Sequence, residues 1–406
     1  MFLQMTDRRA LVQLAAASVV GVATGLVVLA LEHLVEDVLH EIFDAPVWVP
    51  ALAVVLGALA TAALVHIFSG GASATTEVYV EEFHEEVPTI EPNDAPGRLA
   101  AAFTTLGSGA PLGMEGPAVY TGSVVATLLR RRFPTLATQS HNVLLVAAAA
   151  AGIAAVFKAP AAGAIFALEV PYRGRLAGER VLPAIFGSAA GFMTMAAVDG
   201  VEHELALPTV ELTYGRSFGA LVLGVVVGLV AIGVIWLIGQ GERLSDLGPP
   251  WIRALLAGGT LAGLYGIGRG IAGESLALKS GNDVIDWAIA ADHAVWLLVA
   301  VFLLRAIGPA VSIAGGGVGG LFIPLMAAGA VIGRLFADAA NSGDLALYVT
   351  VGAASMLGAG YAVPLTAVVF VAEYTGQAAL IVPGLLAMTT ARLVVGNRSV
   401  SGSQIL

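Results

Sequence analysis

The sequence predicts an all-α protein that crosses a membrane many times, and two observations carry that prediction. Of the 406 residues, 58% are hydrophobic and only 12% are charged, whereas an ordinary soluble domain carries about 25% charged residues. The hydrophobic residues gather in runs, several of which reach the roughly 20 residues that a membrane-crossing helix needs. Because the runs lack the alternation of barrel strands, helices remain as the way to satisfy the backbone in lipid. These runs cover residues 11–31, 48–68, 143–156, 181–198, 218–238, 295–304, 345–356 and 378–395.

Charge limits the possible partners and indicates the orientation of the chain. The formal net charge of −10 does not favour nucleic acid as a partner, and a chain with no cysteine forms no disulfides. Arg8 and Arg9 stand directly before the first hydrophobic run. Because positive residues concentrate on the cytoplasmic side of membrane proteins, we expect both termini in the cytoplasm and the chain in the cell membrane.

A carboxylate between two glycines is the first candidate for function. The stretch Gly113-Met114-Glu115-Gly116-Pro117 separates two apolar segments. Since proline is favoured in the first turn of a helix, we expect a helix to begin at about Pro117, with Glu115 at its positive end. An ionisable residue inside a membrane is a functional candidate. The alternative is a carboxylate that merely caps the helix.

An acidic segment lies before this stretch. Residues 77–94 contain seven carboxylates and no lysine or arginine. The simpler interpretation is a solvated acidic face, and the other is a vestibule that attracts cations or protons.

The two halves of the chain carry matching motifs. Pro160 to Glu169 reads P-x-x-G-x-x-F-x-x-E, and Pro364 to Glu373 reads P-x-x-A-x-x-F-x-x-E. Upstream, Gly113 to Pro117 matches Gly320 to Pro324 at nearly the same distance. This order predicts an internal duplication, with residues 1–210 and 211–406 as the two repeats of one membrane domain. Such repeats often meet at a central site built from broken helices. For Glu169 and Glu373, at matched positions, we favour a structural role.

Three glycine-rich breaks, at residues 70–76, 113–117 and 315–324, each precede a predicted short helix. If the helix N-termini converge, their N–H groups form a site that binds an anion through partial charges. Partial charges allow the anion to leave again, whereas a full positive charge in a pore would hold it. Glu115 could compete for the same N–H groups and act as a gate.

These motifs resemble those of the CLC family of chloride channels and chloride/proton antiporters. Gly113 to Pro117 is similar to the family's gating-glutamate motif G-[R/K]-E-G-P, with Met114 in place of the basic residue. Gly320 to Pro324 fits the family motif G-x-F-x-P. Ala72 to Thr76 stands where the family has G-S-G-x-P and keeps only the serine, Ser73. The resemblance extends over nearly the whole chain.

The resemblance implies a fold, an assembly and a site. The fold would be a CLC-type inverted repeat of about eighteen broken and re-entrant helices, and the protein a homodimer in the lipid bilayer with one anion pathway per subunit. Chloride or a similar small anion would lie between the Ser73 hydroxyl and the amides of Leu321 and Phe322, with Glu115 as outer gate. The amides of Gly116 and Ile323 would complete the binding site. The resemblance implies no cofactor, no metal and no C-terminal regulatory domain.

Three departures from the family pattern affect the expected function. Val170 stands where the antiporters carry their inner proton-transfer glutamate. Ser401 stands near the position of the family's anion-coordinating tyrosine, and it is too short to close the inner end of a pore. We therefore expect an inner mouth that is more open, with weaker anion binding. Met114 removes a positive charge beside the gate, so anion entry would rely on amide dipoles.

The combined expectation is chloride transport that is passive or loosely coupled to protons, with fluoride carried poorly. A strict chloride/proton antiporter is the first alternative. A cation or organic-solute secondary transporter is more remote, because it would need carboxylates or carbonyls at its centre. A metal-dependent intramembrane enzyme is not favoured, since the His-Glu pairs at residues 40–41, 84–85 and 203–204 all lack the second histidine of H-E-x-x-H.

Overall fold

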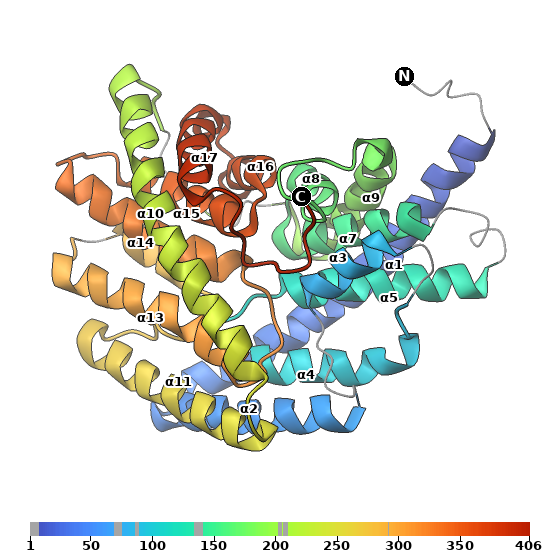
Figure 1. Ribbon diagram of the computed structural model, residues 1–406, viewed down its shortest axis with the longest axis horizontal. Coiled ribbons are helices and arrows are strands. Elements are labelled where there is room, and N and C mark those ends of the chain that lie inside the picture. Colours follow the sequence, from blue (N-terminus) through green and yellow to red (C-terminus); the bar gives the residue numbers. More distant parts are fainter. Residues whose placement is uncertain are drawn as a thin grey trace.

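The computed structural model describes residues 8–68, 75–85, 89–133, 141–201, 205, 210–290 and 292–406. Over these residues the chain forms sixteen α-helices and three short 3₁₀ turns, with isolated bridges in place of a sheet (Figure 1). The predicted all-α fold is therefore confirmed. Ser73 lies outside the described residues.

The first half of the chain contains the helices up to residue 199. They are α1 (Arg8–Asp44), α2 (Trp48–Phe68), α3 (Thr76–His84), α4 (Ala95–Gly107), α5 (Glu115–Arg132), α7 (His141–Phe157), α8 (Pro160–Glu169) and α9 (Val181–Asp199). The second half begins at residue 214. Its helices are α10 (Tyr214–Ser245), α11 (Pro250–Ala272), α12 (Asn282–Ala290), α13 (Val295–Ala314), α14 (Phe322–Ala339), α15 (Leu345–Tyr361), α16 (Pro364–Thr375) and α17 (Ile381–Val395).

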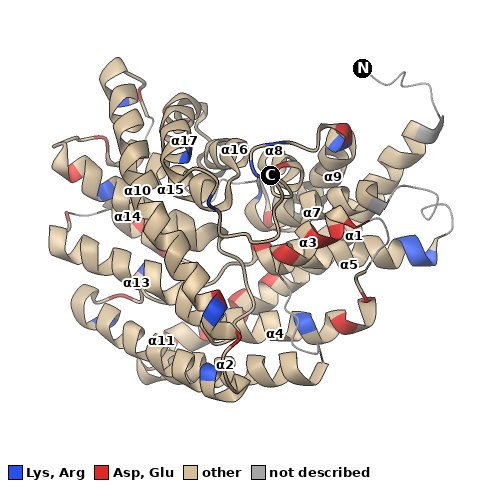
Figure 2. Ribbon diagram, viewed as in Figure 1, with Lys and Arg blue, Asp and Glu red and all other residues tan. Residues whose placement is uncertain are grey.

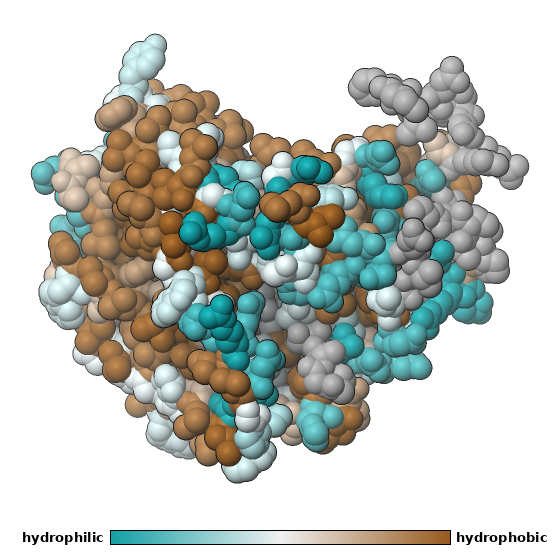
Figure 3. All heavy atoms as spheres, in the orientation of Figure 1, coloured by the Kyte–Doolittle hydropathy of each residue, from teal (hydrophilic) through white to brown (hydrophobic). Residues whose placement is uncertain are grey.

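The outer surface suits a lipid environment. Seven helical stretches in the described part of the chain are long and apolar enough to cross a membrane. Large apolar side chains are exposed along these helices, for example Trp236 at 61% and Leu229 at 61% on α10. Figure 3 shows a broad hydrophobic surface on the side of α10, and Figure 2 shows that the long helices carry few charged residues along their length. The chain is therefore a multi-pass membrane protein.

The short helices come in matching pairs. In the first half α7 is followed by the ten-residue α8, and in the second half α15 is followed by the twelve-residue α16. Lys158 and Ala362, each two residues before the proline that begins α8 or α16, both adopt left-handed backbone with φ of 51° and 59°. A left-handed non-glycine residue is uncommon. Its recurrence at matched positions supports the predicted duplication.

The two short helices exchange caps. Glu169, the last residue of α8, accepts hydrogen bonds from the backbone N–H groups of Leu365 (3.1 Å) and Thr366 (2.8 Å) at the start of α16. Glu373 on α16 accepts hydrogen bonds from Ala161 (2.9 Å) and Ala162 (2.7 Å) at the start of α8. Each carboxylate thus satisfies N–H groups that have no partner within their own helix. This arrangement favours the structural role expected for both glutamates.

We predict that Glu169→Ala lowers the stability of the folded protein by about 1 to 2 kcal/mol, the usual cost of losing a helix cap. Glu169→Gln keeps one side-chain acceptor and should lower it less. Thermal unfolding of the purified protein in detergent measures the effect. Glu179→Ala, which removes an exposed carboxylate in the loop after α8, is the control. Equal melting temperatures for Glu169→Ala and Glu179→Ala would contradict the capping role.

Candidate functional site

Two helix N-termini meet at the centre of the molecule. α5 begins at Glu115 and α14 begins at Phe322. The residues before them form an antiparallel bridge, in which the Gly113 amide donates to the Gly320 carbonyl (2.8 Å) and the Gly320 amide donates to the Gly113 carbonyl (2.7 Å). The structure thus brings together the second and third glycine-rich breaks, from opposite halves of the chain. Both helices present the positive ends of their dipoles at this junction.

Glu115 crosses the junction. Its side chain is fully buried, and Oε1 accepts a hydrogen bond from the backbone N–H of Phe322. Its other oxygen, Oε2, has no hydrogen-bond partner among the described residues. The carboxylate on the first half of the chain therefore occupies the N-terminus of a helix from the second half. That is a position where an anion would bind.

The glycines at the junction make room for this side chain. A Cβ atom on Gly320 would overlap with the carboxyl group of Glu115, and a Cβ atom on Gly113 would overlap with its Oε2. A Cβ on Gly116 would lie only 3.2 Å from the carbonyl carbon of Gly319. Gly113 and Gly320 are therefore required for the observed position of Glu115, and Gly116 for the close approach of the two chain segments.

Two cavities approach the junction from different sides. The first, of about 350 Å3, is lined at its end by Gly319, Gly320, Leu321 and Tyr361, and we call it the Tyr361 vestibule. The second, of about 420 Å3, is lined by residues that include Met114 and Ile323, and we call it the Met114 vestibule. The Phe322 amide, between Leu321 and Ile323 in sequence, is the one that Glu115 occupies. The buried carboxylate therefore lies between the two vestibules.

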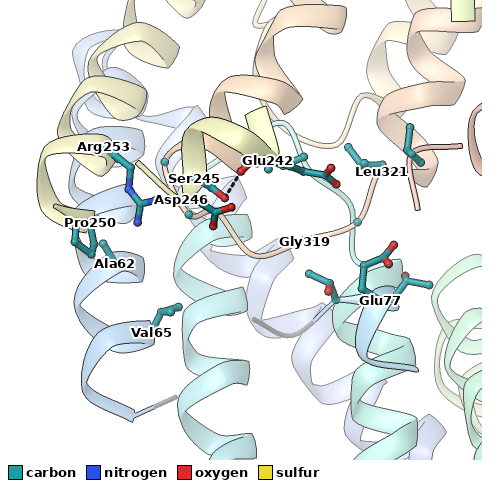
Figure 4. Close-up of a pocket in the computed structure, with 18 of the residues that line it drawn as sticks. Ala62, Val65, Glu77, Glu242, Ser245, Asp246, Pro250, Arg253, Gly319 and Leu321 are labelled. Carbon is teal, nitrogen blue, oxygen red and sulfur yellow. Dashed lines mark hydrogen bonds between the residues drawn. The ribbon is translucent and has the colours of Figure 1, made fainter. Parts of the chain in front are cut away.

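Carboxylates stand around the Tyr361 vestibule. In Figure 4, Glu77 from α3 lies on one side of the chain segment through Gly319, while Glu242 and Asp246 at the end of α10 lie on another. Arg253 contributes a positive charge to the same cavity. The vestibule is therefore wide, polar and rich in acidic groups.

The acidic segment at residues 77–94 is not simply a solvated face. Glu77 lines the Tyr361 vestibule. Glu82 is buried and accepts hydrogen bonds from the backbone N–H groups of Thr89 (3.0 Å) and Ile90 (3.2 Å). The solvated interpretation is wrong for Glu82, which is buried and caps a turn of backbone, whereas the position of Glu77 agrees with the vestibule interpretation.

The Met114 vestibule contains a positive charge that the gating motif lacks. Lys158, at the end of α7, lines this cavity together with Met114. His33 and Asp199 lie in the same cavity and form a hydrogen bond of 3.1 Å. Because Glu32, Glu36 and Asp199 line the same cavity, the expectation that anion entry relies on amide dipoles stays a prediction.

Val170 is part of the packed interior. It is fully buried at the end of α8, and its carbonyl accepts a hydrogen bond from the Gln404 side chain (2.9 Å). An apolar side chain at this position offers no group that could carry a proton.

Ser401 is also buried. Its carbonyl accepts a hydrogen bond from Arg173 (3.0 Å), whereas its hydroxyl has no hydrogen-bond partner among the described residues.

Tyr361 is the residue that the sequence reasoning missed. The Leu321 amide, one of the predicted anion ligands, donates to the Tyr361 hydroxyl at 3.4 Å. α15 therefore places an aromatic hydroxyl at the vestibule, while the expected open inner mouth with weaker anion binding stays a prediction. A signal was present in the sequence: Tyr361 stands three residues before Pro364, where the first repeat has Phe157 three residues before Pro160.

An aromatic cluster surrounds the start of α14. The Phe322 ring stacks on Phe157 with centroids 5.0 Å apart, and it packs edge-on against Phe370 (4.7 Å) and Phe166 (5.9 Å). Phe166 and Phe370 occupy matched positions in the two repeats. Both halves therefore contribute to the rigid apolar support of the Phe322 amide.

Comparison with known proteins agrees with this geometry. The family model for the voltage gated chloride channel matches residues 57–396. An H(+)/Cl(−) exchange transporter ClcA from Citrobacter koseri is 29% identical, over 96% of this chain and 86% of that protein. One from Yersinia pseudotuberculosis is 28% identical, over 96% of this chain and 85% of that protein.

Solved structures share the fold. A slow cyanobacterial Cl−/H+ antiporter has a TM-score of 0.85 at 21% identity, over 96% of each chain. A CLC-type fluoride/proton antiporter has a TM-score of 0.86 at 20% identity, over 99% of this chain and 100% of the other. With the family model matched over most of its length, the chain belongs to the voltage-gated chloride channel (CLC) family of anion transport proteins.

Proposed function

We propose that this protein carries chloride across the cell membrane through a pathway that Glu115 closes. The observation that carries the proposal is the hydrogen bond from the Phe322 amide to the Glu115 carboxylate, at a junction that lies between two vestibules. An ionised carboxylate and a chloride ion are alternative occupants of the same helix N-terminus. Transport then requires Glu115 to leave that position.

Protonation of Glu115 releases the gate in this scheme. The neutral carboxyl group loses its charge-assisted attraction to the amide. Chloride can then reach the amides of Gly116, Leu321, Phe322 and Ile323 at the ends of α5 and α14, with Ser73 as a further ligand predicted from the family motif. Partial charges bind the ion without trapping it.

The orientation follows from the basic loop after α8. This loop carries Arg173 and Arg175, and its backbone pairs with the C-terminal segment at Ile405. By the positive-inside rule this side would face the cytoplasm together with the C-terminal segment, and the Tyr361 vestibule, which Val400 also lines, would open inward. A cytoplasmic N-terminus stays a prediction from Arg8 and Arg9. The two repeats, residues 1–210 and 211–406, build one pathway within one chain. A homodimer with one pathway per subunit stays a prediction from the family.

A passive or loosely coupled pathway fits the site better than strict antiport. Val170 cannot carry a proton, and Glu169 beside it is held as the cap of α16. From the side of the Tyr361 vestibule, protons could reach Glu115 only through water, by way of the carboxylates that line that vestibule. Strict exchange, the activity in the names of the relatives, is the alternative. A cation transporter or an enzyme is disfavoured, because N–H donors rather than oxygen ligands converge at the junction. Selectivity for chloride over fluoride stays a prediction.

We predict that Glu115→Gln opens the pathway. The neutral amide side chain should imitate the protonated gate, so chloride efflux from liposomes at neutral pH should rise several-fold. Wild-type efflux should increase with acid between about pH 4.5 and 7.5, because protonation neutralises the gate, and the variant should lose this pH dependence. Glu179→Gln is the matched exposed control. A Glu115→Gln variant that stays closed, or keeps the wild-type pH profile, would show that Glu115 is not the gate.

The coupling prediction needs a different measurement. In planar bilayers under a chloride gradient, the reversal potential should follow the chloride equilibrium potential. Adding a pH gradient should shift it only slightly, because the inner proton-transfer position is Val170. A shift that corresponds to a fixed exchange ratio would establish strict antiport instead.

Gly320→Ala tests the space that Glu115 occupies. The added Cβ overlaps with the carboxyl group, so Glu115 should be expelled and chloride efflux at neutral pH should approach that of Glu115→Gln. Gly233→Ala, which places a Cβ in open space on α10, is the control. If efflux of the Gly320→Ala variant equals that of wild type and control, the position of the Glu115 carboxylate does not depend on this glycine.

A further inference from the structure

Tyr361 places a hydroxyl group at the inner side of the junction. It is the last residue of α15, only 4% of its surface is exposed, and it lines the end of the Tyr361 vestibule. Its oxygen accepts a hydrogen bond from the Leu321 amide at 3.4 Å. A phenol can donate one hydrogen bond while it accepts another. Tyr361 can therefore offer its proton to an acceptor in the vestibule.

The backbone around Tyr361 is fixed from several directions. The helix ends at once, because Ala362 adopts left-handed backbone and its amide returns to α15 at Gly358. The C-terminal segment holds the same turn: Val400 donates to the Gly360 carbonyl (2.8 Å) and Gln404 donates to the Tyr361 carbonyl (2.9 Å). The hydroxyl is thus preorganised, which lowers the cost of binding a ligand there.

A second hydroxyl faces the same place. Thr76, the first residue of α3, is 3% exposed and lines the Tyr361 vestibule beside Tyr361. Its Oγ1 interacts with the Tyr361 hydroxyl and has no other partner among the described residues. A hydroxyl can donate one hydrogen bond while it accepts another. The two neighbouring hydroxyls can therefore still offer a proton to a ligand in the vestibule.

From this geometry we infer that the hydroxyls of Tyr361 and Thr76 bind the permeating anion on the cytoplasmic side of Glu115, while the Leu321 amide holds the Tyr361 oxygen in place. The inference rests on the proposed anion pathway and names ligands within it. Both hydroxyls can turn a proton toward one acceptor without either of them carrying a full charge. An anion from the cytoplasm would stay bound at this inner site until Glu115 leaves the Phe322 amide.

At this inner site, the Tyr361 hydroxyl takes the place of the aromatic hydroxyl that the C-terminal segment lacks at Ser401. Ser401 is buried, and it is not among the residues that line the Tyr361 vestibule in the described part of the chain. Tyr361 reaches the Leu321 amide from α15 instead. The anion site would therefore keep a phenolic donor, although the donor comes from a different helix.

The test measures chloride binding to purified protein by calorimetry, in wild type and in the Glu115→Gln background. Tyr361→Phe keeps the ring and removes one donor, so chloride affinity should fall about tenfold, as expected for a hydrogen bond to a charged group. Thr76→Val should weaken it several-fold. Tyr348→Phe, which removes a buried hydroxyl from the other end of α15, should bind like the parent protein.

Flux separates a ligand from a structural residue. With Tyr361→Phe, the chloride concentration that gives half-maximal efflux should rise while the maximal rate persists, and the melting temperature should match that of Tyr348→Phe. Unchanged chloride affinity in Tyr361→Phe, with transport intact, would overturn the inference and leave the proposed function standing. Failure of both wild type and Glu115→Gln to bind or carry chloride would overturn both.

Discussion

The hydrogen bond from the Phe322 amide to the Glu115 carboxylate organises the centre of this protein. It joins the first half of the chain to the second at the point where two helices begin. A carboxylate is costly to bury without partners, and here the helix N-termini supply the compensation. The same compensation would serve a chloride ion. Closure of the pathway and binding of the anion therefore depend on one set of N–H groups.

The rest of the fold keeps that junction in place. The bridge between Gly113 and Gly320 fixes the distance between α5 and α14, and the exchange of caps between Glu169 and Glu373 joins α8 to α16. These links are reciprocal, because each half of the chain donates backbone N–H groups to acceptors in the other half. The two halves differ at the matched positions 157 and 361. Phe157 packs on the Phe322 ring, whereas Tyr361 places a hydroxyl beside the Leu321 amide.

Local motifs allowed much of this arrangement to be predicted. The glycine-rich breaks and Glu115 could be recognised because close backbone approach and helix starts leave local signatures of glycine and proline. The matched spacing of the two halves predicted that distant segments converge. The match between Tyr361 and Phe157 marked the position in the sequence, but the contact of Tyr361 with Leu321 could not be predicted, because it depends on where α15 ends relative to α14. Burial of Glu82 was missed for a similar reason, since its partners become visible only when the chain turns back.

The most direct test of the account is to locate a heavy halide in the protein. Crystals of Glu115→Ala grown in bromide should show anomalous density within hydrogen-bond distance of the Phe322 amide, at the place where the carboxylate lies in the wild type. Wild-type crystals under the same conditions should lack bromide there. Bromide beside the Phe322 amide in wild type with Glu115 still bound, or its absence from that amide in Glu115→Ala, would contradict competition between carboxylate and anion for one site.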